Sequence, residues 1–268
     1  MQFLKFLMKK LLPAKVLRKA LDKYFEAKAR KYERQYRGDA VFCPCCGKKF
    51  RSFMYFSMRK NQNNEQRCAD TYKHTVCPNC FSFPRHRIIC HYFDKNKQFI
   101  PQNNVLIFAG EYAIKKWFDT NDCHYQTADL FDRTSDIRID IQNIPFPDES
   151  WELIVCNHVL EHVPNYQIAL KELRRVLTRK GLLEITVPTD RRLSTVYEDS
   201  NIVNKKDRIR HFGQYDHLRV FGNNFEEILK KSGFAVEIVD GCQLPTEIGG
   251  VVGPMNYDDN RVYICRKE

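Results

Sequence analysis

Residues 140–188 read DIQNIPFPDESWELIVCNHVLEHVPNYQIALKELRRVLTRKGLLEITVP. The run 151–156 is short, apolar and rich in β-branched residues, and it follows a PDES turn, so it predicts a buried strand. Asn165 then opens a predicted helix that Gly181 ends, and 182–188 form a second buried strand. The apolar positions of the helix step by three and four: Ile168, Leu170, Leu173, Val176 and Leu177. A strand, a helix and a strand with short connections form a right-handed βαβ unit, so we expect a parallel sheet.

The same stretch contains several motifs in a fixed order. They are D-I-x-x-I-P-F-P-D-x-S-W-E-L-I, then N-H-V-L-E-H-V, then L-R-R-V-L-x-x-x-G. Together they resemble the class I S-adenosylmethionine-dependent methyltransferases of the small-molecule type. The resemblance implies an α/β fold with a seven-stranded, mostly parallel, doubly wound sheet in residues 101–268, and S-adenosylmethionine (SAM) as the cofactor.

Further short apolar runs supply the other strands that such a sheet needs. They are 103–111, 125–131, the run IRI before Asp140, VEIVDG (236–241) and RVYICR (261–266). The segment between the last two runs is too long for a tight hairpin and has no helical pattern, whereas a parallel pair normally needs a helical crossover. We therefore expect these two strands to pair antiparallel, and the sheet to have one antiparallel edge strand.

The resemblance implies a cofactor site at the ends of the first strands. Where the family has a glycine-rich loop, this chain reads Ala109, Gly110 and Glu111, so clearance for the amino-acid end of the cofactor depends on one glycine and one alanine. Asp129 and its neighbour Leu130 follow the next strand. Asp129 would accept both ribose hydroxyls, because a carboxylate pairs well with two adjacent hydroxyl groups. A helix cap is the alternative role for this carboxylate.

Two further pairs of residues complete the predicted cofactor site. Asp140 and Ile141 follow the run IRI, and the family places this acid against the adenine amino group and the next residue near the ring. Asn157 and His158 come just after 151–156, at the edge where ligands bind in doubly wound sheets. A buried, hydrogen-bonded pair is the alternative for Asn157 and His158.

The acceptor side is predicted to involve the charged insertion 189–222, which has no clear periodicity. In the families that the chain resembles, an H-x-R-x-[F/Y] segment faces the acceptor. His217 is therefore the first candidate for a general base, and His211 the second, because histidine titrates near neutral pH. A histidine that only satisfies loop hydrogen bonds is the alternative. Glu161 and His162 are expected to shape the pocket rather than to transfer protons.

Residues 38–100 contain two CxxC pairs, thirty residues apart, each with proline after its first cysteine. Two such knuckles complete a closed tetrahedral zinc site, which stabilises a segment too small to bury a large core. Disulfides and a redox CxxC are the disfavoured alternatives. Cys45 could replace one ligand, and Cys68 is a weaker fifth candidate. The predicted ligands of this structural zinc ion are Cys43, Cys46, Cys77 and Cys80.

A helix is predicted to leave the second knuckle over residues 84–93. Its first turn carries Arg85, His86 and Arg87. These side chains could bind an anionic group of the substrate, but a solvated or salt-bridged face is the favoured interpretation.

The formal net charge of +11 is concentrated in residues 1–37, which hold twelve Lys/Arg against three acidic residues. The basic composition therefore describes an arm rather than a nucleic-acid-binding face on the body. The arm begins with a predicted basic amphipathic helix and continues over 18–37 as a polar, mostly helical spacer. Residues 1–20 would lie on an anionic membrane surface, or pack on the body or a second subunit. Their apolar run is too short for a spanning helix, and no secretory signal is recognisable.

The segments CPNCFSFPRHR and HFGQYDHLRVFG also resemble zinc-ribbon methyltransferases of bacterial surface-glycan gene clusters. This resemblance implies a sugar or lipid-linked glycan acceptor at the inner face of the cytoplasmic membrane. The eleven cysteines, paired as CxxC or single in apolar strands, are typical of a reducing, cytoplasmic compartment. RNA gripped by the zinc ribbon and the basic arm is a second interpretation, which the nearly neutral body disfavours. A non-catalytic scaffold with a degenerate cofactor loop is the third.

Overall fold

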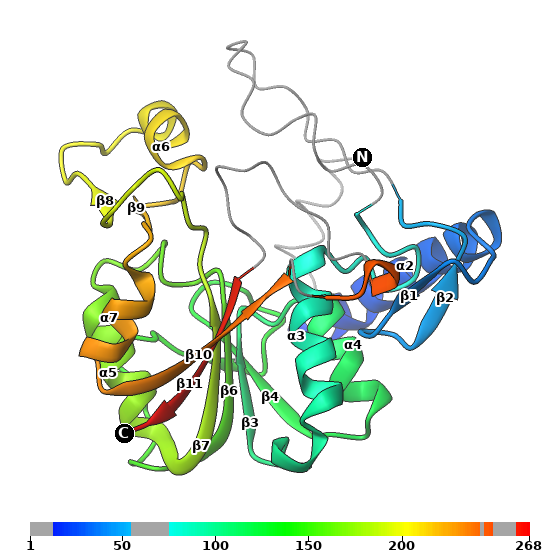
Figure 1. Ribbon diagram of the computed structural model, residues 1–268, viewed down its shortest axis with the longest axis horizontal. Coiled ribbons are helices and arrows are strands. Elements are labelled where there is room, and N and C mark those ends of the chain that lie inside the picture. The colour runs from blue at the N-terminus through cyan, green and yellow to red at the C-terminus, as the bar shows by residue number, and fades with distance from the viewer. Residues whose placement is uncertain (1–12, 55–74, 242–243, 249–260) are drawn as a thin grey trace.

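The computed structural model describes residues 13–54, 75–241, 244–248 and 261–268. In these residues a central sheet is covered by helices on both faces (Figure 1). One face carries α3 (Pro84–Lys95) and α4 (Tyr112–Thr120), and the other carries α5 (Tyr166–Val176) and α7 (Phe225–Lys231). The chain therefore has the three-layer α/β architecture that its sequence predicts.

The central sheet has seven strands in the order β10-β11-β7-β6-β3-β4-β5. Strands β7, β6, β3, β4 and β5 pair parallel, whereas β11 pairs antiparallel with both β7 and β10. The prediction of a mostly parallel, seven-stranded, doubly wound sheet is confirmed. The strands are β3 (Val105–Phe108), β4 (Tyr125–Asp129), β5 (Ile137–Arg138), β6 (Trp151–Asn157), β7 (Leu177–Thr186), β10 (Phe234–Asp240) and β11 (Arg261–Lys267).

The antiparallel strand lies one place inside the edge of the sheet, so its predicted edge position is wrong. Four consecutive residues of β11, Val262 to Cys265, are buried, as a strand covered on both faces requires. Strand β10 instead alternates between more and less exposed positions, with Ala235 and Glu237 exposed. This pattern suits the edge position that β10 occupies.

Helix α5 begins as predicted and ends earlier. The side chain of Asn165 caps it by accepting the backbone N–H groups of Gln167 and Ile168, at 3.0 and 3.1 Å. Three expectations are wrong. The helix stops at Val176 instead of reaching Gly181, and Gly181 lies inside β7 instead of ending the helix. Ile168, expected on the apolar face, is 46% exposed. A Cβ at Gly181 would lie 3.0 Å from the carbonyl oxygen of Glu152, so this glycine admits a close strand contact instead of ending a helix.

The hydrophobic core has two halves, one on each face of the sheet. Because strand side chains alternate, Val105 and Ile107 of β3 face one half, and Leu106 and Phe108 face the other. The first half also contains buried residues of α3 and α4 together with all the cysteines of the two knuckles. The cysteine module and the sheet therefore share one continuous core.

The cysteine module is a small hairpin of β1 (Val41–Cys43) and β2 (Lys48–Phe50), with helix α2 (Ala14–Gln35) beside it. The ring of Phe25 in α2 stacks on Tyr112 with 4.7 Å between centroids, and Glu33 pairs with Lys48 at 2.5 Å. Residues 18–37 are thus mostly helical, as predicted, with the helix ending at Gln35, but they dock on the body rather than act as a spacer. Residues 1–12, most of the predicted amphipathic helix, lie outside the described residues. In the described part of the chain, no helix is long and apolar enough to span a membrane.

The insertion 189–222 is more ordered than its sequence indicates. It contains β8 (Tyr197–Glu198), α6 (Lys205–Phe212) and β9 (Arg219–Val220), and it lies near the top of Figure 1, beyond the carboxyl ends of the parallel strands. The cap of Asn204 on the N–H of Asp207 and the left-handed Gly213 set the ends of α6. Two short 3-10 turns, η1 (Lys97–Phe99) and η3 (Thr246–Ile248), complete the described elements.

Candidate functional site

The carboxyl ends of β6, β3, β4 and β5 lie side by side, because these strands are parallel neighbours. The loop after β3 touches the end of β4 through a hydrogen bond of 3.0 Å from the N–H of Ala109 to the carbonyl oxygen of Ala128. Asp129, the last residue of β4, pairs in register with Arg138 of β5. The fold therefore brings the predicted cofactor residues of three strand ends to one edge of the sheet.

The loop after β3 needs its single glycine. Ala109 adopts a left-handed conformation with φ of 48°, which turns the chain sharply at the end of the strand. A Cβ on Gly110 would come within 2.8 Å of the Cγ2 atom of Thr127. Thr127 cannot yield easily, because its N–H and its hydroxyl both donate to Asp136, at 2.9 and 2.7 Å. The backbone of Gly110 is thereby held close to β4.

Glu111 is fixed in this loop by two side chains of α3. Its Oε1 accepts from Arg85 and its Oε2 from His86, each at 2.7 Å. The Nδ1 atom of His86 accepts the N–H of Phe83, so the proton of this imidazole lies on Nε2 and points to Glu111. Burial opposes ionisation, but the charge of Arg85 and the bond from His86 hold the pKa of Glu111 well below its usual range. Glu111 is therefore an ionised carboxylate at the end of β3.

The basic first turn of α3 forms salt bridges, in agreement with the favoured prediction, but two of its three basic side chains are buried rather than solvated. His86 is buried, and burial lowers its pKa while Glu111 opposes that change. Arg87 is also buried and donates to the carbonyl oxygens of Ile248, Thr75 and Ser82, at 2.7, 2.7 and 2.9 Å. Arg87 thus connects the second knuckle to a distant part of the chain.

The Oδ1 atom of Asp129 accepts the backbone N–H groups of Phe131 and Asp132, each at 2.7 Å. No helix follows β4 before β5 in the described chain, so Asp129 is not the helix cap of the alternative; its side chain instead closes a turn. These two bonds use Oδ1 and aim the carboxylate over the strand end, with Leu130 half-buried beside it. The same side chain can fix the loop and offer its other oxygen to a ligand.

Asp140 is similarly arranged after β5. Its Oδ1 accepts from the backbone N–H of Gln142 at 2.9 Å, and Ile141 between them is buried. The Gln142 side chain in turn accepts the N–H of Asn165, the cap of α5, at 2.8 Å. This chain of contacts fixes the loop of Asp140 against the βαβ unit.

The side chain of Asn157 turns into the protein rather than toward the crevice. Its amide donates to Glu184 at 3.0 Å, and its oxygen accepts from the hydroxyl of Thr186 at 2.5 Å. Burial raises the pKa of Glu184 to about 8, although the bond from Asn157 opposes the rise, so this carboxyl is protonated at neutral pH. For Asn157, the buried, hydrogen-bonded alternative describes the observed contacts.

His158 takes the neighbouring position with a left-handed backbone, φ of 53°, and its N–H donates to the carbonyl oxygen of Thr186 at 3.0 Å. Its Nδ1 lies 3.2 Å from Oε1 of Glu161. The left-handed backbone of His158 is strained, and its side chain lies beside Glu161, which belongs to a polar cluster between the loop after β6 and the residues before β9.

We call Glu161, His162 and His217 the Glu-His-His cluster. Their candidate ligand atoms all lie within 4.8 Å of one another, and the two imidazole rings meet edge to face with centroids 4.7 Å apart. The Nδ1 atom of His217 donates to the carbonyl oxygen of Phe212 at 2.9 Å, so its Nε2 carries a lone pair. Burial lowers the pKa of His217, with Glu161 opposing. His211 is not part of this cluster, and its Nδ1 forms a hydrogen bond of 2.7 Å with the hydroxyl of Tyr197.

Arg219 assembles the cluster, and sequence reasoning missed it. Its guanidinium donates to the carbonyl oxygens of Leu160, Val163 and Pro164, at 2.9, 2.5 and 2.9 Å. The N–H of Leu218 adds a bond of 2.8 Å to the carbonyl oxygen of Glu161. Arg219 and Leu218 thus fix His217 against the loop after β6. The sequence feature that could have indicated this role is the arginine two residues after His217, because a guanidinium can donate several hydrogen bonds at once.

The four predicted zinc ligands form one buried group. The Sγ atoms of Cys43 and Cys80 are 3.6 Å apart, and those of Cys46 and Cys77 are 3.8 Å apart. Tetrahedral zinc with Zn–S bonds of ~2.3 Å places its sulfurs about 3.8 Å apart, so the group fits this ion. Cys45 is buried nearby but is not a member of the group, and Cys68 lies outside the described residues.

The two knuckles have the same local geometry. In each, the residue after the second cysteine is left-handed: Gly47 has φ of 67° and Phe81 has φ of 58°. The carbonyl oxygen of the first cysteine accepts the N–H of that residue, at 2.9 Å for Gly47 and 3.1 Å for Phe81. Phe81 adopts this unfavourable conformation while its ring packs against Tyr112 and Phe25. In the described residues every cysteine is a free thiol.

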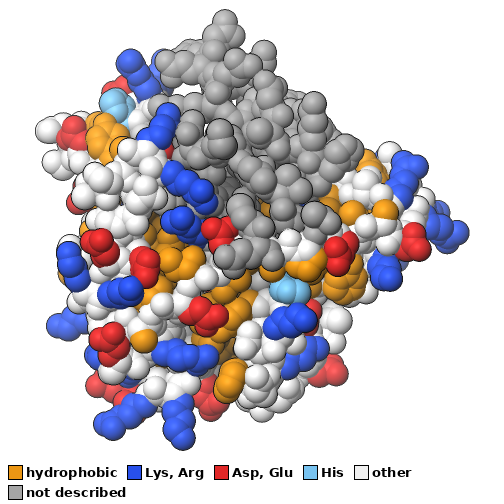
Figure 2. Space-filling model, viewed as in Figure 1, with side chains coloured by type: hydrophobic (Ala, Val, Ile, Leu, Met, Phe, Trp, Pro, Cys, Tyr) orange, Lys and Arg blue, Asp and Glu red, His pale blue; other side chains and the backbone are white. Residues whose placement is uncertain are grey.

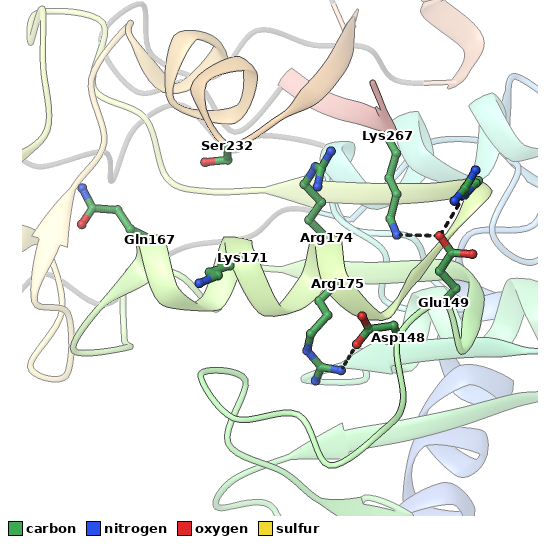
Figure 3. A pocket seen from close by; sticks show the side chains of 9 residues that line it. Asp148, Glu149, Gln167, Lys171, Arg174, Arg175, Ser232 and Lys267 are labelled. Carbon is green, nitrogen blue, oxygen red and sulfur yellow. Dashed lines mark hydrogen bonds and ion pairs between the residues drawn. The ribbon is translucent and has the colours of Figure 1, made fainter.

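A hollow of about 710 Å³ extends along α5, from Gln167 in its first turn to the amino-end edge of the sheet (Figure 3). Asp148 and Glu149 precede β6, and Lys267 ends the antiparallel β11, so this end of the hollow faces the amino ends of the parallel strands. Its charged groups pair with one another, as in the contacts of Glu149 with Lys267 and Arg179 at 3.7 and 3.3 Å. Ligands of doubly wound sheets bind at the other edge, so this hollow is not the candidate site.

Comparison with known proteins gives a match to a family model described as a methyltransferase domain, over residues 78–239. An uncharacterized protein from Methanocaldococcus jannaschii is 31% identical over 137 residues, which are 49% of this chain and 60% of that protein. A demethylmenaquinone methyltransferase from Staphylococcus haemolyticus is 39% identical over 62 residues, 22% of this chain and 26% of that protein. The matches thus span less than two thirds of the length of either curated relative.

The comparison with solved structures gives matches of low sequence identity. A SAM-dependent methyltransferase from Thermotoga maritima, described as a possible histamine N-methyltransferase, has a TM-score of 0.41 and 16% identity, and covers 69% of this chain and 92% of its own. A 1,6-didemethyltoxoflavin-N1-methyltransferase from Burkholderia thailandensis, with S-adenosylhomocysteine bound, has a TM-score of 0.42 and 15% identity over 69% of this chain and 76% of its own.

Proposed function

The chain belongs to the methyltransferase-domain family, and from this premise we propose that it transfers a methyl group from SAM to a small-molecule or glycan acceptor. The observation that carries the proposal is the convergence of Gly110, Asp129 and Asp140 at neighbouring strand ends. This edge of a doubly wound sheet is where such folds bind their ligands.

The residues at this edge have the chemistry that SAM requires. The close approach of Gly110 to β4 leaves backbone amides for the amino-acid end of the cofactor, and the ionised Glu111 suits its ammonium group. Asp129 would hold the ribose hydroxyls, and Asp140 and Ile141 would hold the adenine. When bound, SAM supplies a methyl group that its sulfonium already activates, so the chain's main task is alignment of the reacting groups.

His217 is the proposed general base for a hydroxyl acceptor. Its Nδ1 is committed to the carbonyl oxygen of Phe212, which leaves the Nε2 lone pair to accept a proton. The lowered pKa of His217, caused mainly by burial, keeps this lone pair available at neutral pH. His211 is the weaker candidate, because its Nδ1 bonds a hydroxyl, Tyr197, which can donate to it and so leave the imidazole proton on Nε2.

We further propose that the acceptor is a sugar or lipid-linked glycan at the cytoplasmic face of the membrane, with residues 1–20 as the contact to anionic lipid. The support is the resemblance of CPNCFSFPRHR and HFGQYDHLRVFG to glycan-cluster enzymes. The four-cysteine group, with zinc as its structural ion, would hold the first knuckle, the second knuckle and α3 together beside the acceptor region. An RNA acceptor has less support, since acidic and basic side chains are interspersed on the body in the face that Figure 2 shows.

Calorimetric titration with SAM tests the cofactor proposal. Wild-type protein should bind one equivalent, and Asp129→Ala should weaken binding tenfold or more, as the loss of a charged hydrogen bond of ~1.5–3 kcal/mol implies. Asp129→Asn keeps an oxygen for the N–H groups of Phe131 and Asp132, so it separates the loop-fixing role from the ribose role.

The matched control is Asp148→Ala, which removes an exposed carboxylate at the other edge of the sheet and should leave SAM affinity unchanged. No heat at millimolar SAM would support the non-catalytic scaffold and overturn the proposed activity. Binding of RNA that weakens steeply with salt would favour the RNA acceptor instead.

A further inference from the structure

We infer that the Glu-His-His cluster, Glu161 with His162 and His217, is a second metal site, which holds a divalent first-row ion where the acceptor binds. The inference deepens the proposed function and rests on it for the acceptor's place. It starts from Glu161, whose side chain is fully buried. In the described residues, no group donates a hydrogen bond to either oxygen of its carboxylate.

A buried carboxylate without hydrogen bonds is costly unless a cation compensates it. The nearest protein groups are imidazoles: Nδ1 of His158 at 3.2 Å and Nε2 of His162 at 3.9 Å from Oε1. The carboxylate thus faces nitrogen atoms that can themselves be metal ligands. Because all the candidate ligand atoms of the cluster lie within 4.8 Å of one another, one ion can reach the three side chains together.

His217 is oriented as metal ligands are, and His162 has a carboxylate near its second nitrogen. A ligating imidazole commonly donates its other N–H to a carbonyl oxygen or a carboxylate, which fixes the tautomer. His217 donates Nδ1–H to the carbonyl oxygen of Phe212, and its buried Nε2 has no hydrogen-bond partner in the described part of the chain. His162 has Oδ2 of Asp216 at 3.6 Å behind its Nδ1. Nε2 of His217 is therefore free to bind an ion, and Nε2 of His162 lies 3.9 Å from Oε1 of Glu161.

The ligand set selects the kind of ion. Two imidazoles and one carboxylate suit zinc, manganese or iron(II), and three protein ligands leave positions open for a substrate oxygen. The side chain of His162 is 33% exposed, which gives the cluster a route to solvent and acceptor. A hydroxyl bound to such an ion loses its proton more readily, and the proton passes to solvent water. In the loaded protein the ion would take the place of direct proton transfer to Nε2 of His217.

Manganese(II) is the probe of choice, because thiolates select softer ions and the four-cysteine group can first be filled with a single equivalent of zinc, with no excess left for the Glu-His-His cluster. Zinc-loaded wild-type protein should bind one further equivalent of Mn²⁺, measured by loss of the free-ion electron paramagnetic resonance signal. Glu161→Gln and His217→Gln should each weaken this binding at least tenfold. His124→Gln removes an exposed histidine before β4, at the other edge of the sheet, and should bind Mn²⁺ as the wild type does.

SAM calorimetry on the same samples separates the two proposals. Variants that bind SAM normally but not Mn²⁺ would establish the second site in a folded protein. Wild-type protein that binds SAM but no Mn²⁺ at millimolar concentration, or Glu161→Gln that keeps wild-type Mn²⁺ affinity, would overturn the metal site alone. Mn²⁺ binding without SAM binding would instead overturn the proposed function.

Discussion

The four-cysteine group and the Glu-His-His cluster differ in how the chain assembles them. Each pair of cysteines comes from one tight turn, so the spacing of the ligands is written locally in the sequence. Glu161 and His162 are neighbours, but His217 arrives from an insertion that follows α5 and β7. A site made of local turns can therefore be predicted from residue spacing. A site completed by a long insertion can be predicted only if the residue that fixes the insertion, here Arg219, is recognised.

The two groups also differ in closure. The four thiols are buried and would satisfy a tetrahedral ion completely, as a structural site does. The Glu-His-His cluster offers three ligands and a partly exposed His162. One group can therefore stabilise the fold, and the other can meet a substrate.

The largest expected effect comes from removing one ligand of the four-cysteine group. Cys77→Ser should abolish zinc retention and lower the free energy of unfolding by more than ~5 kcal/mol, because zinc binding is folding free energy for so small a module. Zinc content and urea denaturation measure both quantities. Cys45→Ala is the control, since Cys45 is equally buried but outside the group. Loss of zinc in Cys45→Ala would contradict the ligand set.

The second prediction compares two buried carboxylates. Glu161 is proposed to meet a cation, whereas Glu184 stays neutral because burial raises its pKa from 4.5 to about 8. Between these pH values the folded chain holds a proton that the unfolded chain has released, so the free energy of unfolding falls as the pH rises. Glu184→Gln has no carboxyl group to titrate, so its free energy of unfolding should not fall in this way. Above pH 8 that free energy should exceed the wild-type value by at most about 5 kcal/mol.

Urea denaturation at pH 5, 7 and 9 checks the prediction for Glu184. Glu152→Gln, an exposed carboxylate on the neighbouring strand β6, should follow the wild-type pH dependence. If Glu184→Gln shows that same dependence, Glu184 is ionised in the folded chain and the account of this buried network is wrong.

A smaller effect is expected from changing Arg219, which fixes the loop of the Glu-His-His cluster. Arg219→Lys keeps the charge but loses the fork that reaches Leu160, Val163 and Pro164, and it should cost about 2–4 kcal/mol of folding stability. It should also weaken Mn²⁺ binding, because the loop of Glu161 is released. Glu198→Gln removes only the exposed partner of Arg219 and should cost under ~1 kcal/mol. Equal effects of the two changes would show that the loop does not depend on the guanidinium.

Much of the fold was predictable, because it follows from local patterns. The run WELIVC, the cap at Asn165 and the two CxxC spacings each specify their structure within a few residues. The misses arise where tertiary contacts decide. Gly181 looks like a helix stop but admits a strand contact, and β11 takes an inner place because its apolar run can be covered on both faces.

The candidate site was predictable only in part, for the same reason. Strand ends are visible in the sequence, so Asp129 and Asp140 could be placed at the crevice. The direction of a side chain at a strand end is not visible, and Asn157 turns inward because Glu184 and Thr186 provide partners. The role of Glu161 depends on residues far along the chain, which no local pattern contains.

A crystal structure with S-adenosylhomocysteine and Mn²⁺ bound would locate the cofactor and the metal ion together. We expect the nucleoside beside Asp129 and Asp140, the amino-acid end over Gly110, and the sulfur directed at the Glu-His-His cluster, with a metal peak between Glu161 and His217. A ligand bound at the other edge of the sheet, or with its sulfur directed away from the cluster, would show that the proposed site is wrong.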